Sequence, residues 1–201
     1  MNKILVWDWP VRIGHWSMVA AFALAWLTAE SESWRLVHAM SGGALVGVIL
    51  FRLLWGVIGT RHARFASFVR GPRAVFAYLT GLMTKRAAHT TGHNPAGGWA
   101  ILLLLALGLM TGASGWLVYN DLGGEMTEEL HEGFANAMLA VVGVHLAGVL
   151  VGSLAHRENL IRAMLTGYKL GTTDEAIASA RLYAVPFLLA SAVLWGVWLA
   201  R

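Results

Sequence analysis

Residues 131–156 read HEGFANAMLAVVGVHLAGVLVGSLAH and form the most informative stretch of the chain. From Gly133 to His156 this stretch contains no Asp, Glu, Lys or Arg, and it is long enough to cross about 30 Å of hydrocarbon as a helix. It also carries His131 and His145, whose spacing corresponds to about 21 Å of helix rise and nearly four whole turns. The two imidazoles are therefore predicted on one face of one membrane helix, at two depths.

Four further segments have the same apolar character. They are residues 13–29, 36–60, 97–119 and 182–200, and Arg52 is the one charge inside them. The first segment resembles a signal peptide in length, but Asp8 precedes it and no tripartite pattern is clear, so we expect a helix there. The five segments predict an all-α, polytopic membrane helical bundle, with a four-helix core in residues 1–170 and a linker plus fifth transmembrane helix in residues 171–201.

The composition excludes a soluble protein. The 201 residues are 57% hydrophobic and 13% charged, against about 25% charged residues in soluble domains. The absence of Cys excludes disulfides, iron–sulfur clusters, thiolate-bound zinc and covalently attached c-type haem. Any metal must use His, Met or carboxylate ligands, so the eight histidines become the candidates. The spans show no nucleotide-binding loop, hydrolytic triad or carboxylate pair.

Charged residues are divided between the two sides of the predicted bundle. Lys and Arg gather in residues 1–12, 61–86 and 157–181, which predicts a cytoplasmic N-terminus and a C-terminus on the outer side. Lys and Arg are retained at the cytoplasmic surface of a membrane, and this explains the basic face without a nucleic-acid partner. Residues 73–85 are predicted to form an interfacial helix on the cytoplasmic side. The outer side is acidic, with Glu30, Glu32, Asp121, Glu125, Glu128, Glu129 and Glu132.

Four histidines can be matched by depth. His15 lies about 22 Å below the outer end of its span, close to the depth of His145, while His38 and His131 both begin inward-running helices. We define His15 with His145 as the inner pair and His38 with His131 as the outer pair. Bis-imidazole ligation of two b haems needs this arrangement, and hydrogen bonding between helices is the alternative. The remaining candidates, predicted as solvated surface residues, are His62, His89 and His156, of which His156 is the alternative to His145.

Small residues and one arginine complete the candidate site. A flat macrocycle needs small residues beside it, and the candidates are Gly42, Gly43, Gly47, Gly108, Gly112 and Gly115. The spacing of Gly43 with Gly47, and of Gly108 with Gly112, is equally typical of close helix contacts. Arg52 lies fourteen residues after His38, level with the inner pair, where it either binds a haem propionate or extends to the cytoplasmic surface.

These motifs resemble one known superfamily. They are WDWPVRIGHW at 7–16, His38 with Gly42 and Gly43, FRLLWG at 51–56, GHNPAGG at 92–98, and His131 with His145. Together they resemble the bacterial cytochrome b561 and nickel-iron hydrogenase b-type cytochrome superfamily over roughly residues 5–170. The resemblance implies a four-helix diheme core, two non-covalent b haems, a quinone-reactive site and electron transfer across the bacterial inner membrane. The fifth span departs from the minimal four-helix members.

Three functions are compatible with these residues. The first is electron transfer between membrane quinone and a cationic periplasmic carrier such as a c-type cytochrome. The second is a superoxide oxidase that reduces quinone, and the third is a non-redox membrane protein. The acidic outer side favours the first, because it attracts a basic partner and repels superoxide. We expect the quinone near the inner pair, beside Arg12, Arg52, Trp16, Trp55 and His93.

Overall fold

The computed structural model describes residues 2–84 and 86–201, so Lys85, the last residue of the expected helix 73–85, lies outside it. The described residues are mainly helical, which confirms the all-α class. The α-helices are α1 (Trp9–Thr28), α2 (Arg35–Ile58), α3 (Phe65–Phe68), α4 (Pro72–Met83), α5 (Pro95–Tyr119), α6 (Gly124–His156), α7 (Leu160–Thr166) and α8 (Val185–Leu199). Short elements complete them: β1 (Asn2–Leu5), β2 (Tyr168–Gly171), and the 3-10 turns η1 (Glu32–Trp34), η2 (Thr173–Glu175) and η3 (Leu182–Ala184).

Two helices, α1 and α6, begin a full turn or more before their charge-free runs. α1 begins at Trp9 because the Asp8 carboxylate accepts a hydrogen bond from the Val11 backbone N–H at 2.9 Å, and Pro10 favours the first turn. α6 begins at Gly124, after Gly123 adopts a left-handed backbone with φ of 89°. Its first turns are acidic and extend the helix beyond the apolar run. A charge-free criterion detects only the membrane part of such a helix.

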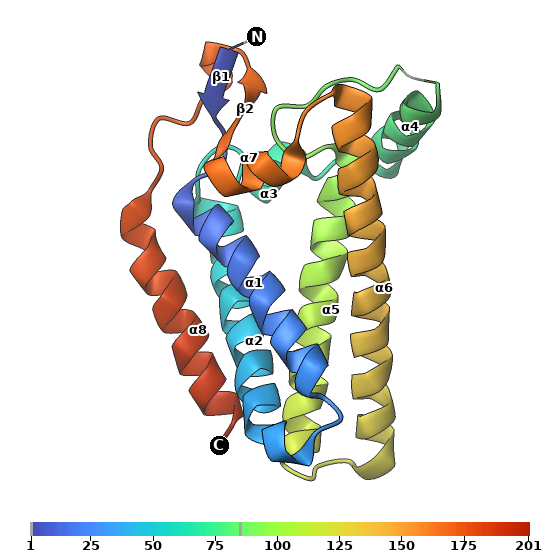
Figure 1. Cartoon of the computed structure of the whole chain (residues 1–201), viewed down its shortest axis with the longest axis vertical. Helices are drawn as coiled ribbons and strands as arrows, with labels where there is room; N and C mark the ends of the chain where they lie inside the picture. The colour runs from blue at the N-terminus through green and yellow to red at the C-terminus, as the bar shows by residue number, and fades with distance from the viewer. Residues whose placement is uncertain (1, 85) are drawn as a thin grey trace.

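The four core helices α1, α2, α5 and α6 run along the long axis of the molecule, and α8 lies on the far side of α2 (Figure 1). Within the described residues, four helical segments are long and apolar enough to cross a membrane: Glu32–Ile58, Pro95–Tyr119, Gly124–His156 and Leu182–Leu199. α1 is not among them, since it carries Arg12 and His15 in its first half. Its crossing of the membrane stays a prediction, supported by its packing along α2.

The two ends of the bundle differ in structure (Figure 1) and in the charge of their residues. The basic end contains α3, α4, α7 and the antiparallel strands β1 and β2, which pair from Asn2 with Gly171 to Leu5 with Tyr168. The acidic end consists of the connections at residues 29–34 and 120–123. α4 matches the amphipathic helix expected at 73–85. In the described part of the chain, the basic end therefore has a cap of several short elements, whereas the acidic end has the 3-10 turn η1.

The packing of α8 explains two of the predicted glycines. A side chain at Gly43 would collide with the Trp195 carbonyl, and one at Gly47 with the Ser191 carbonyl. The Ser191 hydroxyl also donates a 2.8 Å hydrogen bond to the Gly47 carbonyl. These two glycines bring the backbones of α2 and α8 into contact, as small residues do between membrane helices. Gly43, expected beside a haem, faces the fifth helix instead.

Candidate functional site

The outer pair joins α2 to α6 near the acidic end. The ring centres of His38 and His131 lie 6.0 Å apart. His38 Nδ1 lies 2.8 Å from the Ala25 carbonyl oxygen, and His131 Nδ1 lies 3.0 Å from that of Thr111. A carbonyl only accepts hydrogen bonds, so each Nδ1 carries the proton and donates it. Each Nε2 is then left with the free lone pair that a metal ion requires.

α5 supports the outer pair at close range. A side chain at Gly115 would come within 2.8 Å of His131 Cε1, so glycine lets the imidazole lie against the α5 backbone. Ser114 Oγ is 3.3 Å from His131 Nδ1 and adds a second polar contact. Gly42 has open space around its Cα, whereas Gly112 lies against the Val46 side chain. Of the six predicted glycines, Gly42 and Gly115 therefore have the surroundings that suit a cofactor best.

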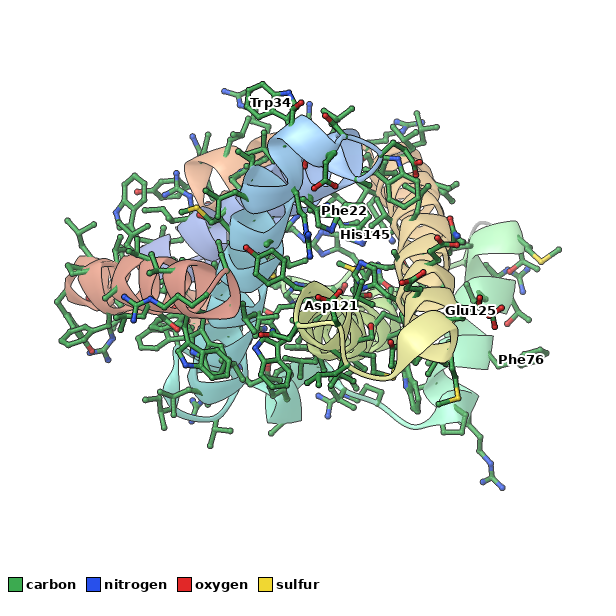
Figure 2. All side chains as sticks on the ribbon, turned by 90° about the horizontal axis from the view of Figure 1, so that it is seen from below. Phe22, Trp34, Phe76, Asp121, Glu125 and His145 are labelled. Carbon is green, nitrogen blue, oxygen red and sulfur yellow. The ribbon has the colours of Figure 1, made fainter. Side chains whose placement is uncertain are left out.

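The inner pair joins α1 to α6 closer to the basic end. The ring centres of His15 and His145 lie 6.5 Å apart, and the His15 ring meets Trp16 edge-on at 5.1 Å. Figure 2 looks along the bundle from the acidic end and shows His145 pointing from α6 toward α1. Unlike the outer pair, this pair has no backbone carbonyl at Nδ1 of His15, which is buried without a hydrogen-bond partner among the described residues.

Both pairs have the separation of two imidazoles that share one metal ion. Imidazole nitrogens bind metals at about 2 Å, which places the centres of two opposed rings roughly 6 Å apart. No group of three or more His, Asp or Glu side chains suited to a metal is present in the described part of the chain. An iron already held by a macrocycle needs only two protein ligands. The donor sets therefore fit haem iron.

Two buried nitrogens at the level of the inner pair have no partner in the described structure. Arg52 Nη2 donates a 3.0 Å hydrogen bond to the Ala63 carbonyl, but Nη1 is left over, and so is His93 Nδ1. Burial lowers the pKa of His93 well below its usual value, and the charges of Arg52, Lys169, His145 and His62 lower it further. A buried guanidinium with one unpaired N–H group is costly, so this region suits a carboxylate ligand such as a propionate.

Asp8 supports the region around Arg52 and the inner pair, although it was not among the site residues predicted from the sequence. Its buried carboxylate accepts hydrogen bonds from Trp55 Nε1 at 3.0 Å and from the Thr60 hydroxyl at 2.7 Å, besides capping α1. It thereby ties the start of α1 to the end of α2, the two helices that carry His15 and Arg52. The Asp-Trp-Pro sequence before an apolar run was the available signal, because it is typical of a helix N-terminus.

The five residues expected around a quinone are not brought together. Arg12 and Trp16 line a cavity of about 440 Å³ between α1 and α7. The Arg12 guanidinium lies over the Trp9 ring at 4.1 Å and donates to the Leu165 carbonyl, while its Nε has no partner in the described residues. Trp55 instead lines a different cavity, between α2 and α8. Arg52 and His93 line neither cavity.

The remaining histidines belong to the cap at the basic end. His62 is buried rather than solvated, and its Nε2 lies 2.8 Å from the Glu175 carbonyl. His156 contacts the Tyr78 hydroxyl at 3.3 Å and the His89 ring at 5.6 Å. The ring of His145, not that of His156, therefore faces α1.

Comparison with known proteins gives one result that agrees with this geometry. The family model described as prokaryotic cytochrome b561 matches residues 6–167. No curated protein and no solved structure matches the chain. The matched region includes all four histidines of the two pairs and ends before η2, η3 and α8.

Proposed function

The chain belongs to the prokaryotic cytochrome b561 family of membrane b-type haem proteins, and from this premise we propose that it transfers electrons through two non-covalent b haems. The observation that carries the proposal is the presence of two His pairs at different depths, each with ring centres about 6 Å apart. The inner pair would hold one haem and the outer pair the other. Both pairs share α6, which sets their separation along the membrane normal.

Each residue has a definite role in this proposal. Bound haem supplies a reversible one-electron couple. Neutral imidazoles of both pairs would each donate one ring-nitrogen lone pair to the iron. In the outer pair this nitrogen would be Nε2, because the Ala25 and Thr111 carbonyls hold the rings in the required tautomer. Arg52 Nη1 and His93 Nδ1 would bind a propionate carboxylate of the inner haem. The apolar side chains of α1, α2, α5 and α6 exclude water from both sites.

The cavity between α1 and α7 is the favoured quinone site. Its walls contain Trp9, Trp16 and Met164, and the Arg12 side chain adds a cation to this otherwise aromatic and apolar lining. Trp16, which lines this cavity, directly follows His15 on α1. The electron path from a quinone in the cavity to the inner pair would therefore be short. The nearby basic end supplies the aqueous side with which quinone protons exchange.

The acidic end is the favoured docking site for a cationic electron carrier such as a c-type cytochrome. Asp121 and Glu125 lie at this end in Figure 2, and Glu32, Glu128 and Glu129 are also exposed. We assign this end to the periplasm and the N-terminus to the cytoplasm of a bacterial inner membrane, in agreement with the distribution of Lys and Arg. Attraction between opposite charges would accelerate the encounter.

Two measurements test the proposal. A reduced-minus-oxidised spectrum with a pyridine haemochrome count should give two b haems per chain, and one haem or none would contradict it. Stopped-flow mixing of the quinol-reduced protein with a basic cytochrome should give a rate that falls with added salt, because screening shortens to about 8 Å near 0.15 M. Replacing Glu125, Glu128 and Glu129 by Gln should lower the cytochrome rate. A faster superoxide reaction in this variant, with no cytochrome reaction in the parent, would favour the superoxide oxidase instead.

A further inference from the structure

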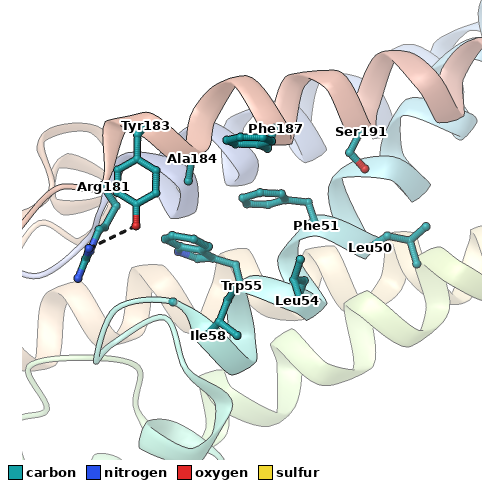
Figure 3. Close-up of a pocket in the computed structure, with 11 residues that line it drawn as sticks. Leu50, Phe51, Leu54, Trp55, Ile58, Arg181, Tyr183, Ala184, Phe187 and Ser191 are labelled. Carbon is teal, nitrogen blue, oxygen red and sulfur yellow. Dashed lines mark hydrogen bonds between the residues drawn. The ribbon is translucent and has the colours of Figure 1, made fainter.

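α2 and α8 touch near the acidic end and separate toward the basic end. Contact is closest where Gly43 and Gly47 meet the α8 backbone, and Gly196 in turn lies against the Met40 carbonyl. Further along, the two helices border an open, wedge-shaped cavity of about 590 Å³ (Figure 3). Its α8 wall lies outside residues 6–167, so the family match does not account for it.

The walls of this wedge are apolar and its mouth is charged. Leu50, Leu54 and Phe51 form the α2 side, and Phe187 lies opposite (Figure 3). Arg181 lies at the basic end of the cavity, where its Nη1 donates a 3.3 Å hydrogen bond to the Tyr183 hydroxyl. No acidic side chain pairs with Arg181 within the described residues, and its side chain is exposed. It is the one charged residue among those that line the wedge.

The polar groups deeper in the wedge are already engaged. The Ser191 hydroxyl donates to the Gly47 carbonyl, and Trp55 Nε1 donates to the Asp8 carboxylate at 3.0 Å. A quinone ring placed deep between the helices would find neither of these donors free for its carbonyl oxygens, because the remaining donors, Arg181 and the Tyr183 hydroxyl, lie at the mouth. A ligand that fits must therefore combine a long apolar part with an anionic group at one end.

We propose that the wedge binds one anionic phospholipid of the leaflet at the basic end. Its phosphate pairs with Arg181, and an acyl chain fills the space between Leu54 and Phe187. Basic residues between transmembrane helices on the cytoplasmic side recognise anionic headgroups in this way. The lipid completes the contact of α8 with α2 where the two backbones have separated. The proposal requires membrane-spanning helices but no particular haem or quinone chemistry.

Native mass spectrometry tests the proposal on the full-length protein in nanodiscs of equal phosphatidylglycerol and phosphatidylcholine. One phosphatidylglycerol should stay bound per chain after the other lipids are released. Arg181→Gln should lower this retention about fivefold, the effect of one cation at the membrane surface. The matched control is Arg162→Gln, which removes an exposed cation of α7 at the same end and should leave retention unchanged.

A second variant tests the apolar part of the site. Leu54→Trp fills the wedge from the exposed side of α2 while Arg181 stays in place, and it should also lower retention. The far-UV circular dichroism spectrum and the unfolding temperature of each variant, which do not depend on bound haem, show that the protein is folded. Equal retention of phosphatidylcholine, equal losses for Arg181→Gln and Arg162→Gln, a retained quinone, or no retained lipid in the parent protein would each overturn the proposal.

Discussion

The outer and inner His pairs have nearly the same ring separation but different surroundings. In the outer pair, backbone carbonyls of α1 and α5 hold Nδ1 of His38 and His131. In the inner pair, His15 Nδ1 is unpartnered, and the nearby Arg52 and His93 also have unpartnered buried nitrogens in the described structure. The protein thus orients the outer imidazoles by itself. At the inner pair it leaves polar groups that a bound ligand must satisfy.

This difference separates two ways in which a bundle prepares a site. Backbone hydrogen bonds orient a ligand and raise its basicity without adding charge. A buried arginine adds positive charge that stabilises an anionic or reduced cofactor. We therefore expect the inner haem to have the higher reduction potential, and the experiments below test that difference.

The largest expected effect is the loss of one haem. His145→Ala or His15→Ala should remove the inner haem, and His131→Ala or His38→Ala the outer one, because a five-coordinate haem loses half of its protein ligation. Pyridine haemochrome counts should fall from two to one per chain. His89→Ala, which lies in the cap, serves as the control with two haems. Loss of the same haem from His15→Ala and His131→Ala would show that the pairs are wrongly assigned.

The second effect concerns the charge beside the inner pair. Arg52→Met removes the partner proposed for a propionate, and should lower the inner-haem potential by about 60–130 mV, since a hydrogen bond to a charged group contributes about 1.5–3 kcal/mol. The outer-haem potential should not change. Redox titration monitored optically measures both values. Arg64→Met, at an exposed cation of the basic end, is the control, and an equal shift in both variants would refute a local role for Arg52.

The third effect distinguishes the two faces of α2. Gly43→Val should destabilise the packing of α8 by about 1–3 kcal/mol, because the new side chain meets the α8 backbone. Both haems should be retained, since His38 and Arg52 form their hydrogen bonds with Ala25 and Ala63, which lie outside α8. Thermal unfolding and the haemochrome count give the two readouts. Loss of the outer haem in Gly43→Val would instead indicate that Gly43 lies beside the cofactor. The control is Gly133→Val, at a position on α6 where a side chain meets open space.

The fourth effect is a pH dependence specific to the basic end. Burial lowers the pKa of His62 and of His93 below the ordinary value of 6.5, so the folded cap favours their neutral forms. The unfolded chain takes up these protons first, and stability is therefore full above about pH 6.5 and falls as the pH drops below it. The unfolding temperature should decrease by a few degrees between pH 7.5 and pH 5.5, at roughly 2–4 °C per kcal/mol. His62→Gln should weaken this dependence, and an unchanged slope would exclude His62 as a contributor.

The smallest effect is expected at the outer pair. Ser114→Ala removes a 3.3 Å contact to His131 Nδ1 but leaves the shorter bond to the Thr111 carbonyl. The outer-haem potential should therefore move by less than about 30 mV, or about 0.7 kcal/mol for one electron. A larger shift would mean that the hydroxyl, rather than the carbonyl, holds the imidazole.

Helix periodicity was sufficient to predict which histidines meet. The spacing of His131 and His145 on one apolar run, and the depths of His15 and His38, depend only on helix rise and on where each span begins. The family match and the ring distances agree with the resulting core. The ligand roles themselves stay predictions until haem is counted in the variants.

Rotation about a helix axis was harder to predict than depth. Gly43 and Gly42 are adjacent in sequence, yet Gly43 meets α8 and Gly42 faces open space. The spacing of Gly43 with Gly47 indicated a close helix contact as the alternative to a haem contact, but it did not indicate which helix would make that contact. For the same reason, His62 was predicted to be solvated because it lies in a basic segment, although the fold buries it against Glu175 of η2. Trp55 does not join the residues expected around the quinone, because its indole N–H donates to the Asp8 carboxylate.

The pairing of β1 with β2 has a consequence for the order of assembly. Asn2–Leu5 precedes all four core helices in the chain, but its partner Tyr168–Gly171 follows them. Contacts between such distant segments form late, since closing a long loop costs entropy before the contact repays it. The acidic end, joined by short connections, can close while the cap is still missing. The route by which a cofactor enters the nascent bundle is therefore open longest at the basic end, beside the inner pair.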